Sequence, residues 1–469
     1  LEGFSNKGMI TVALLFLVSE GIRQSGTLGQ VIKKLLPQGK TTVFKAQLRI
    51  LPSVAFISAF LNNTPVVVIF APIIKHWAKS VKLPATKFLI PLSYVTILGG
   101  ICTLIGTSTN LVVHGMILEA GYEGFTMFEL GKVGIFIAIA GIIYLFIFSK
   151  RLLPDARPDT AVPDEEVEEG EKLHRVEAVL GARFPGINKK LSDFNFQRHY
   201  GAEVKEIKTR NGQRYVDHLE DVVLREGDTL VVMADDTFIP TWGESSVFVL
   251  LTNGNDPDTS GKKKRWLALI LLVLMIVGAT VGELPATKEM FPDIKLDMFF
   301  FVCITTIIMA WTNIFPARKY TKYISWDILI TIACAFAISK AMVNSGVADC
   351  VAGFIIGLSD DYGPHVLLAI LFVITNLFTE LITNNAAAAL AFPLALSISA
   401  QLGVSPTPFF VVICMAASAS FSTPIGYQTN LIVQGIGNYK FTDFVRIGLP
   451  LNIITFLISV ILIPLIWNF

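Results

Sequence analysis

Long apolar stretches separated by short polar segments run along most of this chain of 469 residues. A helix needs about 18 or more apolar residues to cross the ~30 Å core of a bilayer. Stretches of this kind predict spans near residues 8–25, 88–117, 131–149, 266–284, 296–314, 325–343, 407–435 and 446–467. The pattern therefore predicts an all-α polytopic membrane protein.

Two further apolar regions, 50–74 and 366–397, are interrupted by polar triplets. We call these triplets the first tip (Asn62-Asn63-Thr64) and the second tip (Thr383-Asn384-Asn385). Irregular backbone at membrane depth is tolerated only where protein or a water-filled cavity satisfies its polar groups. The tips therefore predict re-entrant hairpins, in which two half-helices meet inside the membrane.

Two of the predicted spans contain a cluster of Gly, Thr and Asn, which we call a knot. The first knot is residues 105–115 (IGTSTNLVVHG), and the second is residues 425–435 (IGYQTNLIVQG), 320 positions later. Both knots keep a central asparagine, Asn110 or Asn430. These polar breaks predict broken helices at the centre of a transport site.

The knots belong to a longer internal repeat. The two tips superpose at an offset of 321, which also places Pro72 on Pro393, and Ser25-Gly26 falls on Ser345-Gly346 at an offset of 320. Spacing held over about a hundred residues indicates a duplication. Spans 266–284 and 296–314 have no partner in the first copy, so about two helices of the first repeat are expected to be missing. With them, each repeat has an odd number of crossings, which predicts two inverted repeats.

Lysine and arginine gather in alternate loops. They flank the first hairpin region, follow the span 131–149 and precede the span 266–284, whereas residues 344–365 and 398–406 contain none. Positive residues favour the cytoplasmic side. The insert at 153–260 is therefore predicted to be cytoplasmic and the C-terminus extracytoplasmic. This divides the chain into a first membrane repeat (1–152), a cytoplasmic linker and domain (153–260) and a second membrane repeat (261–469).

The insert has the pattern of a small α+β domain after an acidic linker at residues 164–171. Strand-like segments lie at 173–180, 204–208, 228–234 and 247–251, and Asn211-Gly212 signals a turn. Residues 225–232 (REGDTLVV) resemble the closing strand of TrkA-C-like domains. That resemblance implies a regulatory or dimerising module with a small-molecule regulator; a passive cytoplasmic cap is the alternative.

Composition excludes several classes of function. The chain is 53% hydrophobic and 16% charged, with a net charge of +1, which is typical of a membrane protein. Its five cysteines lie in or beside apolar segments without ligand spacing, so we expect no disulfide and no transition-metal site. The chain has no Walker loop, nucleophile elbow or His/Cys metal motif. We therefore expect neither an enzyme nor a nucleic-acid partner, and no cofactor.

The chemistry of the tips suits ions of both signs. A helix N-terminus exposes unpaired N–H groups and a partial positive charge, which attract an anion. Helix C-terminal carbonyls with Ser, Thr and Asn oxygens suit Na+. Because the hairpin centres contain almost no Lys or Arg, a divalent anion would need co-bound cations to offset its desolvation. Coupling of anion to Na+ would then follow from electrostatics.

Paired tips, each followed about 45 residues later by a knot, resemble the divalent anion:sodium symporter family and its ion-transporter superfamily. The family reads Ser-Asn-Thr at its tips, and dicarboxylate-type members read Pro-Pro-Asn in their knots; this chain departs from both patterns. The segment STPIGYQTN at 422–430, together with the TrkA-C-like insert, looks more like the sulfate-transporting branch. The resemblance implies elevator-type Na+ symport of a small divalent anion by a homodimer. The expected location is a bacterial inner membrane.

The resemblance also implies site residues. The first sodium site would use Ser58, Asn62, Asn63 and Gly106, and the second Thr379, Thr383, Asn384 and Gly426. The anion would contact Asn63, Thr64, Thr107 and Ser108 on one side and Asn384, Asn385, Tyr427 and Gln428 on the other. Substrate choice is expected at Thr107 against Tyr427 and Ser108 against Gln428.

Other interpretations stay open. Any single Ser or Thr here could simply pack helix against helix. A dicarboxylate symporter is one alternative, and a Na+/H+ antiporter or arsenite exporter of the same superfamily is another. An antiporter needs a titratable carboxylate in the ion path, for which Glu380 is the candidate. A gated ion channel is the alternative from a different class.

Overall fold

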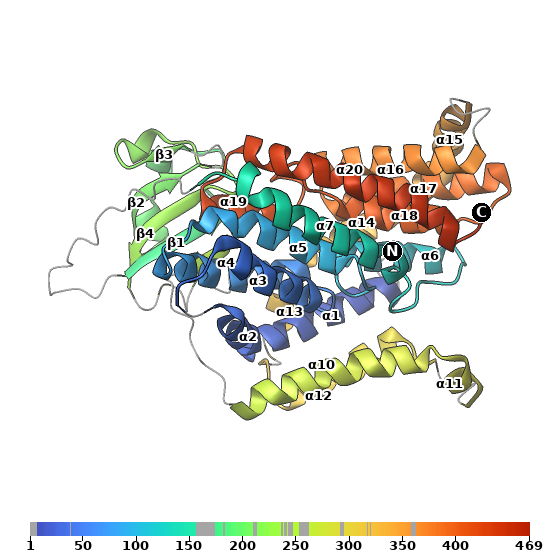
Figure 1. The fold of residues 1–469 in the computed structure, drawn as a ribbon, viewed down its shortest axis with the longest axis horizontal. Coiled ribbons are helices and arrows are strands. Elements are labelled where there is room, and N and C mark those ends of the chain that lie inside the picture. Colours follow the sequence, from blue (N-terminus) through green and yellow to red (C-terminus); the bar gives the residue numbers. More distant parts are fainter. Residues whose placement is uncertain are drawn as a thin grey trace.

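The computed structural model describes residues 7–155, 174–252, 262–290, 295–357 and 363–469, apart from gaps at 38, 182, 210–212, 236–237, 239–241, 243–246, 317 and 319. Figure 1 shows an elongated body of helices with a β-sheet at one end. The predicted acidic linker at 164–171 and the predicted turn at 211–212 lie outside the described residues.

The first half of the helical body has seven α-helices among its described residues. They are α1 (Lys7–Gln24), α2 (Thr27–Leu35), α3 (Val43–Ser58), α4 (Asn63–Ser80), α5 (Leu89–Gly100), α6 (Ser108–Glu119) and α7 (Gly131–Leu152), with a 3-10 turn η2 (Ala85–Lys87) before α5. Between α1 and α2, Gly26 has a φ of +70°, a conformation that favours glycine.

The second half begins after the sheet. Its helices are α10 (Lys262–Gly282), α11 (Pro285–Met290), α12 (Met298–Trp311), α13 (Tyr320–Tyr323), α14 (Trp326–Asn344), α15 (Val347–Gly357), α16 (Gly363–Leu381), α17 (Asn384–Leu402), α18 (Thr407–Ser418), α19 (Gln428–Gly437) and α20 (Phe441–Ile466). Between α14 and α15, Gly346 has a φ of +72°. It thus repeats the backbone conformation of Gly26, 320 positions earlier.

Helix packing also recurs between the halves. Helix α3 packs against α5 as α16 packs against α18, and α2 packs against α4 as α15 packs against α17. Contacts across the halves are reciprocal: α4, which begins in the first tip, packs against α19, and α17, which begins in the second tip, packs against α6. Each tip-bearing helix therefore lies against the knot helix of the other half.

The most deeply buried helices are α5 and α18, which each lead into a knot. Every residue of α5 is buried, as is every residue of α18 except its first. Helix α5 packs on α3, α4, α7 and α19, while α18 packs on α6, α16, α17 and α20. These two helices form the centre of the body on which the tips and knots rest.

Five of the described helices are long and apolar enough to cross a membrane: α7, α10 from Lys263, α16, α17 and α20. A sixth span exists if the pair Leu329–Asn344 and Val347–Gly357, bent by 71°, counts as one. The sequence predicted eight spans, two of them broken at the knots, and assigned α16 and α17 to a re-entrant hairpin. Four predicted spans are not counted here because 88–117 and 407–435 do break at the knots, α12 has 14 residues and α1 contains three charged side chains. Helices α16 and α17 are counted because each has 19 apolar-rich residues. The membrane depth of the tips stays a prediction.

The described part of the insert contains five strands: β1 (His174–Leu180), β2 (Glu203–Lys208), β3 (Arg214–Tyr215), β4 (Thr229–Ala234) and β5 (Phe248–Thr252). They form one antiparallel sheet in the order β3-β2-β4-β1-β5. The short helix α8 (Phe196–Tyr200) packs Tyr200 on Phe184 and Phe248 in a separate core. Strands β1, β2, β4 and β5 lie on the four segments that the sequence predicted as strands.

The sheet contacts the helical body through a partly buried carboxylate. Glu177 on β1 lies 3.1 Å from Nζ of Lys75 on α4 and 3.2 Å from Nζ of Lys208 on β2. Burial raises the pKa of Glu177, but the two ammonium groups outweigh burial and lower this pKa to about 2. The carboxylate therefore stays charged at neutral pH, and the ion pair that joins sheet and helix persists.

Lys87 gives a direct test of how α5 and α7 are joined. Its buried Nζ donates to the carbonyls of Lys150 (2.8 Å) and Leu153 (2.6 Å) at the end of α7. Lys87→Met leaves these carbonyls without that donor, so we expect a loss of roughly 1–3 kcal/mol of stability. The measurement is thermal unfolding in detergent. Lys79→Met, at an exposed position, is the control, and equal melting temperatures for the two variants would contradict this role.

Candidate functional site

At the first tip, one hydroxyl faces two acceptor oxygens. Oγ of Ser58, the last residue of α3, lies 2.7 Å from Oδ1 of Asn63 and 2.9 Å from the carbonyl oxygen of Thr96. A hydroxyl has a single proton. With the amide oriented as described, this buried cluster has more acceptor oxygens than protons to share among them. Such a donor set fits a cation ligated by oxygen.

The second tip repeats this cluster at an offset of 321. Oγ1 of Thr379 lies 2.7 Å from Oδ1 of Asn384 and 2.6 Å from the carbonyl oxygen of Ala417. Thr96 and Ala417, which contribute the carbonyl oxygens of the two clusters, were not among the predicted site residues. Every residue type has a backbone carbonyl, so the residue type does not indicate which carbonyl lines a site. Only the repeat offset could have pointed to Thr96 and Ala417.

Each knot is tied to the tip of its own half. Nδ2 of Asn110 donates to the carbonyls of Gly100 (3.4 Å) and Thr103 (2.9 Å). Nδ2 of Asn430 donates to those of Ser420 (2.8 Å) and Thr423 (3.1 Å). Asn110 and Asn430 therefore stabilise the loops that precede α6 and α19, as expected for structural residues of the knots.

Two threonines then join each knot to the hairpin of its own half. The hydroxyls of Thr103 and Thr423 each accept from a knot glycine N–H at 3.2 Å. They donate to the carbonyls of Ala59 and Glu380, respectively, and neither threonine was among the predicted site residues.

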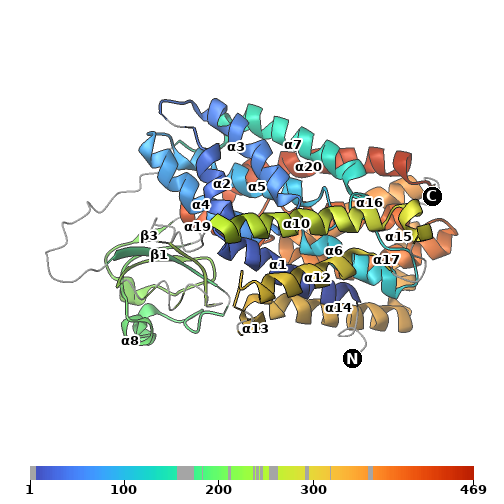
Figure 2. The ribbon, with the colours of Figure 1, turned by 90° about the horizontal axis from the view of Figure 1, so that it is seen from below.

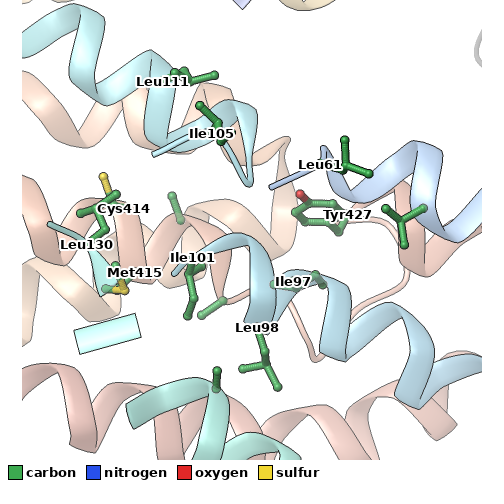
Figure 3. Close-up of a cluster of buried hydrophobic side chains, with 14 of the residues drawn as sticks. Leu61, Ile97, Leu98, Ile101, Ile105, Leu111, Leu130, Cys414, Met415 and Tyr427 are labelled. Carbon is green, nitrogen blue, oxygen red and sulfur yellow. The ribbon is translucent and has the colours of Figure 1, made fainter. Parts of the chain in front are cut away.

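Tips and knots then meet across the halves. Nδ2 of Asn63 donates to the hydroxyl of Tyr427 (2.6 Å), which also lies 3.3 Å from Oγ1 of Thr107. Figure 3 shows the Tyr427 ring close to Leu61 of the first tip region within the buried apolar cluster. Oγ1 of Thr64 donates to Gln428 at 3.3 Å.

On the other side of the site, Oδ1 of Asn385 accepts from Ser108 (3.3 Å) and Thr109 (3.2 Å). Hydrogen bonds thus connect seven of the eight predicted anion-binding residues across the two halves: Asn63, Thr64, Thr107, Ser108, Asn385, Tyr427 and Gln428. The first tip meets the second knot, and the second tip meets the first knot.

The eighth, Asn384, marks an asymmetry. It is 7% exposed, and its Nδ2 has no hydrogen-bond partner, whereas Nδ2 of its repeat mate Asn63 is bonded to Tyr427. A buried amide without a partner costs free energy. The second tip therefore presents a free N–H donor, the group that an oxyanion would accept from.

Two predicted sodium ligands lie apart from these clusters. Asn62 and Thr383 are the N-cap residues of α4 and α17, and neither side chain caps its helix. Asn62 lines a small cavity with Ser108, Phe60 and apolar residues of α1 and α10. The side chain of Thr383 is exposed. Their role as ligands stays a prediction.

The two carboxylate oxygens of Glu380, beside the second tip, have different surroundings. Its Oε1 accepts from the Ser422 N–H (2.8 Å) and from Nδ2 of Asn452 on α20 (2.7 Å). Its Oε2 is buried without a hydrogen-bond partner. The carboxylate therefore ties α16 to the second knot region and to α20.

Four helices begin at this network. They are α4 at Asn63, α6 at Ser108, α17 at Asn384 and α19 at Gln428. Each helix N-terminus contributes unpaired N–H groups and a positive end of the helix dipole. The network itself is built from amides and hydroxyls without a charged side chain. Its positive potential therefore comes from backbone.

Comparison with known proteins points to transport. The profile of the citrate transporter family (CitMHS) matches residues 1–398 and 289–469. An uncharacterized transporter, sll0640, from Synechocystis sp. is 29% identical, and the match covers 100% of this chain and 90% of the relative. Probable sodium/sulfate cotransporter 3 of Chlamydomonas reinhardtii is 32% identical over 60% of this chain and 31% of the relative. The sodium-dependent dicarboxylate transporter SdcS of Staphylococcus saprophyticus is 25% identical over 31% of this chain and 28% of the relative.

The knot glycines allow a sharp test of the oxygen clusters. A Cβ on Gly106 would lie 2.5 Å from the Gly100 oxygen and 2.9 Å from the Ala59 oxygen next to the first tip, and one on Gly426 would lie 2.6 Å from the Thr379 oxygen. Gly106→Ala or Gly426→Ala must therefore push a knot away from its tip. We expect at least about tenfold weaker Na+ binding, or about 1.4 kcal/mol, read as a smaller Na+-induced rise in melting temperature. Gly353→Ala is the control, since its Cβ meets only one atom, at 3.8 Å; equal Na+ responses would refute the assignment.

Proposed function

The chain belongs to the citrate transporter (CitMHS) family, and from that premise we propose that it is a secondary active transporter that carries a small divalent anion together with Na+, with sulfate as the first candidate. The observation that carries this proposal is the convergence of four helix N-termini on one network of neutral side chains. The helix N-termini favour an anion, while no Lys or Arg side chain in the network neutralises its charge.

The anion would lie between the two tips. Asn384 would donate its free Nδ2, and the N–H groups at the starts of α6, α17 and α19 would complete the cradle. Neutral donors from fixed backbone suit a tetrahedral oxyanion as well as a carboxylate. Tyr427 and Gln428 in the second knot, against Thr107 and Ser108 in the first, would set the shape of the site.

Sodium ions would occupy the two oxygen clusters. Ser58, Asn63 and the Thr96 carbonyl would hold one, and Thr379, Asn384 and the Ala417 carbonyl the other. Asn63 and Asn384 each contribute their amide oxygen to a cation cluster. The amide nitrogen of Asn384 would donate to the anion, and that of Asn63 donates to Tyr427, which lines the anion site. Cation binding would therefore orient the amide that meets the anion, which couples the two ions through single side chains.

The movement that completes transport is also part of the proposal. We assign the two halves as inverted repeats, the tips as re-entrant hairpins, and the hairpin-bearing helices as the body that moves in an elevator-like step within a homodimer. The recurring packing of the two halves supports the first assignment. The insert would be a TrkA-C-like module on the cytoplasmic side of a bacterial inner membrane.

A carboxylate substrate is the second candidate. The family's description as citrate transporters and the similarity to SdcS favour it. Against it, neither knot contains the Pro-Pro-Asn of dicarboxylate-type members, because Ser108-Thr109-Asn110 and Gln428-Thr429-Asn430 stand there.

Uptake into proteoliposomes tests the proposal. Radiolabelled sulfate should accumulate under an inward Na+ gradient, and Asn384→Ala should lose roughly ten- to hundredfold in apparent affinity, as expected for a hydrogen bond to a charged ligand worth about 1.5–3 kcal/mol. Asn468→Ala, at an exposed position near the C-terminus, is the matched control. Uptake of succinate or citrate in place of sulfate would select the second candidate. Equal sulfate uptake with and without the Na+ gradient would contradict the coupling of sulfate to Na+.

Glu380→Gln separates symport from antiport. The amide can keep an oxygen acceptor for Ser422 and Asn452 but cannot exchange a proton. We expect Na+-driven uptake to survive with less than about a tenfold loss, because the carboxylate acts as a structural acceptor. Complete loss of transport, together with Na+-driven proton movement in the parent protein, would instead support the antiporter.

A further inference from the structure

The cytoplasmic sheet lies on two particular helices. Figures 1 and 2 both place it beside α4 and α19. These are the helices that bring Asn63 and Thr64 of the first half against Tyr427 and Gln428 of the second half. The sheet therefore contacts both helices that form one side of the proposed anion site. It does so away from their N-terminal ends, which carry the site residues.

The contact with α4 is the partly buried ion pair. Glu177 reaches Lys75, whose side chain is 21% exposed, and is held in place by Lys208, whose side chain is 6% exposed. Lys75 lies twelve residues after Asn63, or about 18 Å along the helix at 1.5 Å per residue. Removing the carboxylate leaves the ammonium groups of Lys75 and Lys208 without this shared partner, and Lys208 is nearly buried, which makes the contact sensitive to single substitutions.

At the contact with α19, the missing side chain of Gly435 lets side chains of the sheet approach the helix backbone closely. A Cβ on Gly435 would lie 2.6 Å from Oγ1 of Thr229 on β4, and Val179 of β1 is 3.6 Å from the same point. Gly227, with a φ of +84°, lies against the side chain of Leu431. Gly435 follows Gln428 by seven residues, so this contact is about 10 Å from the start of α19.

From these contacts we propose that the sheet is a staple: it fixes α4 against α19 and thereby positions the Asn63–Tyr427 and Thr64–Gln428 contacts of the binding site. Glu177, Lys75 and Gly435 are then positioning residues that act on the substrate without touching it. The inference rests on the proposed transport function for its kinetic consequence, although the coupling between sheet and site is structural. Any event that lifts the sheet lowers anion affinity.

Two substitutions release the sheet from opposite sides. Glu177→Gln removes the charge that pairs with both lysines, and Gly435→Leu puts a side chain where Thr229 packs. Glu203→Gln is the matched control, because Glu203 pairs with Lys205 on the same sheet with both side chains 54% exposed. Hydrogen exchange of β1 and β4 shows whether each variant releases the sheet.

Two readouts then follow the site. The KM for anion uptake should rise at least about threefold in both releasing variants with a smaller change in kcat, while Glu203→Gln stays at the parental KM. In a background without the five natural cysteines, a Thr64→Cys probe should react faster with a maleimide when the sheet is released. A short bifunctional thiol reagent joining Lys75→Cys to Glu177→Cys should restore the parental KM.

The outcomes are separable. If the parent takes up no anion, the proposed function fails, and thiol labelling at position 64 still tests the staple. Faster exchange in the sheet with unchanged KM and unchanged labelling overturns the staple. Unchanged exchange in both variants overturns it as well, because the named contacts would then not hold the sheet.

Discussion

The structure depends on one interaction that occurs twice: a buried asparagine amide at each tip, Asn63 or Asn385, forms hydrogen bonds with the knot of the other half. Neither tip can satisfy its amides within its own hairpin. Asn63 reaches Tyr427 and Asn385 reaches Ser108 and Thr109, so each half supplies what the other lacks. This exchange forces α4 against α19 and α17 against α6, and it brings four helix N-termini to one place.

That arrangement has an electrostatic consequence. Positive ends of helices attract an anion, but they carry partial charge and cannot neutralise two full negative charges. In the proposed mechanism the remaining compensation would come from cations in the adjacent oxygen clusters, where Ser58 and Thr379 each face two acceptors with one proton. Anion and cation binding would then depend on each other through Asn63 and Asn384, without a separate coupling element.

Much of this could be predicted from the sequence, because polar residues in an apolar run and a fixed repeat offset are visible in residue types. The positions of Asn63, Asn384, Asn110 and Asn430 follow from those two signals. The carbonyls of Thr96 and Ala417 could not be found in this way, since backbone groups are common to every residue. The breaks at the knots were also predicted, because Gly, Thr and Asn interrupt those two apolar runs. The contact of Glu177 with Lys75 was missed because surface charge indicated only membrane orientation.

A structure determined with Na+ and selenate, whose anomalous scattering distinguishes it from water, tests the central claim most directly. Selenate should lie between the two tips, within hydrogen-bond distance of Nδ2 of Asn384, and a sodium ion should lie at each cluster around Ser58 and Thr379. Selenate bound elsewhere in the chain, or bound between the tips to the same extent when Na+ is replaced by choline, would contradict it.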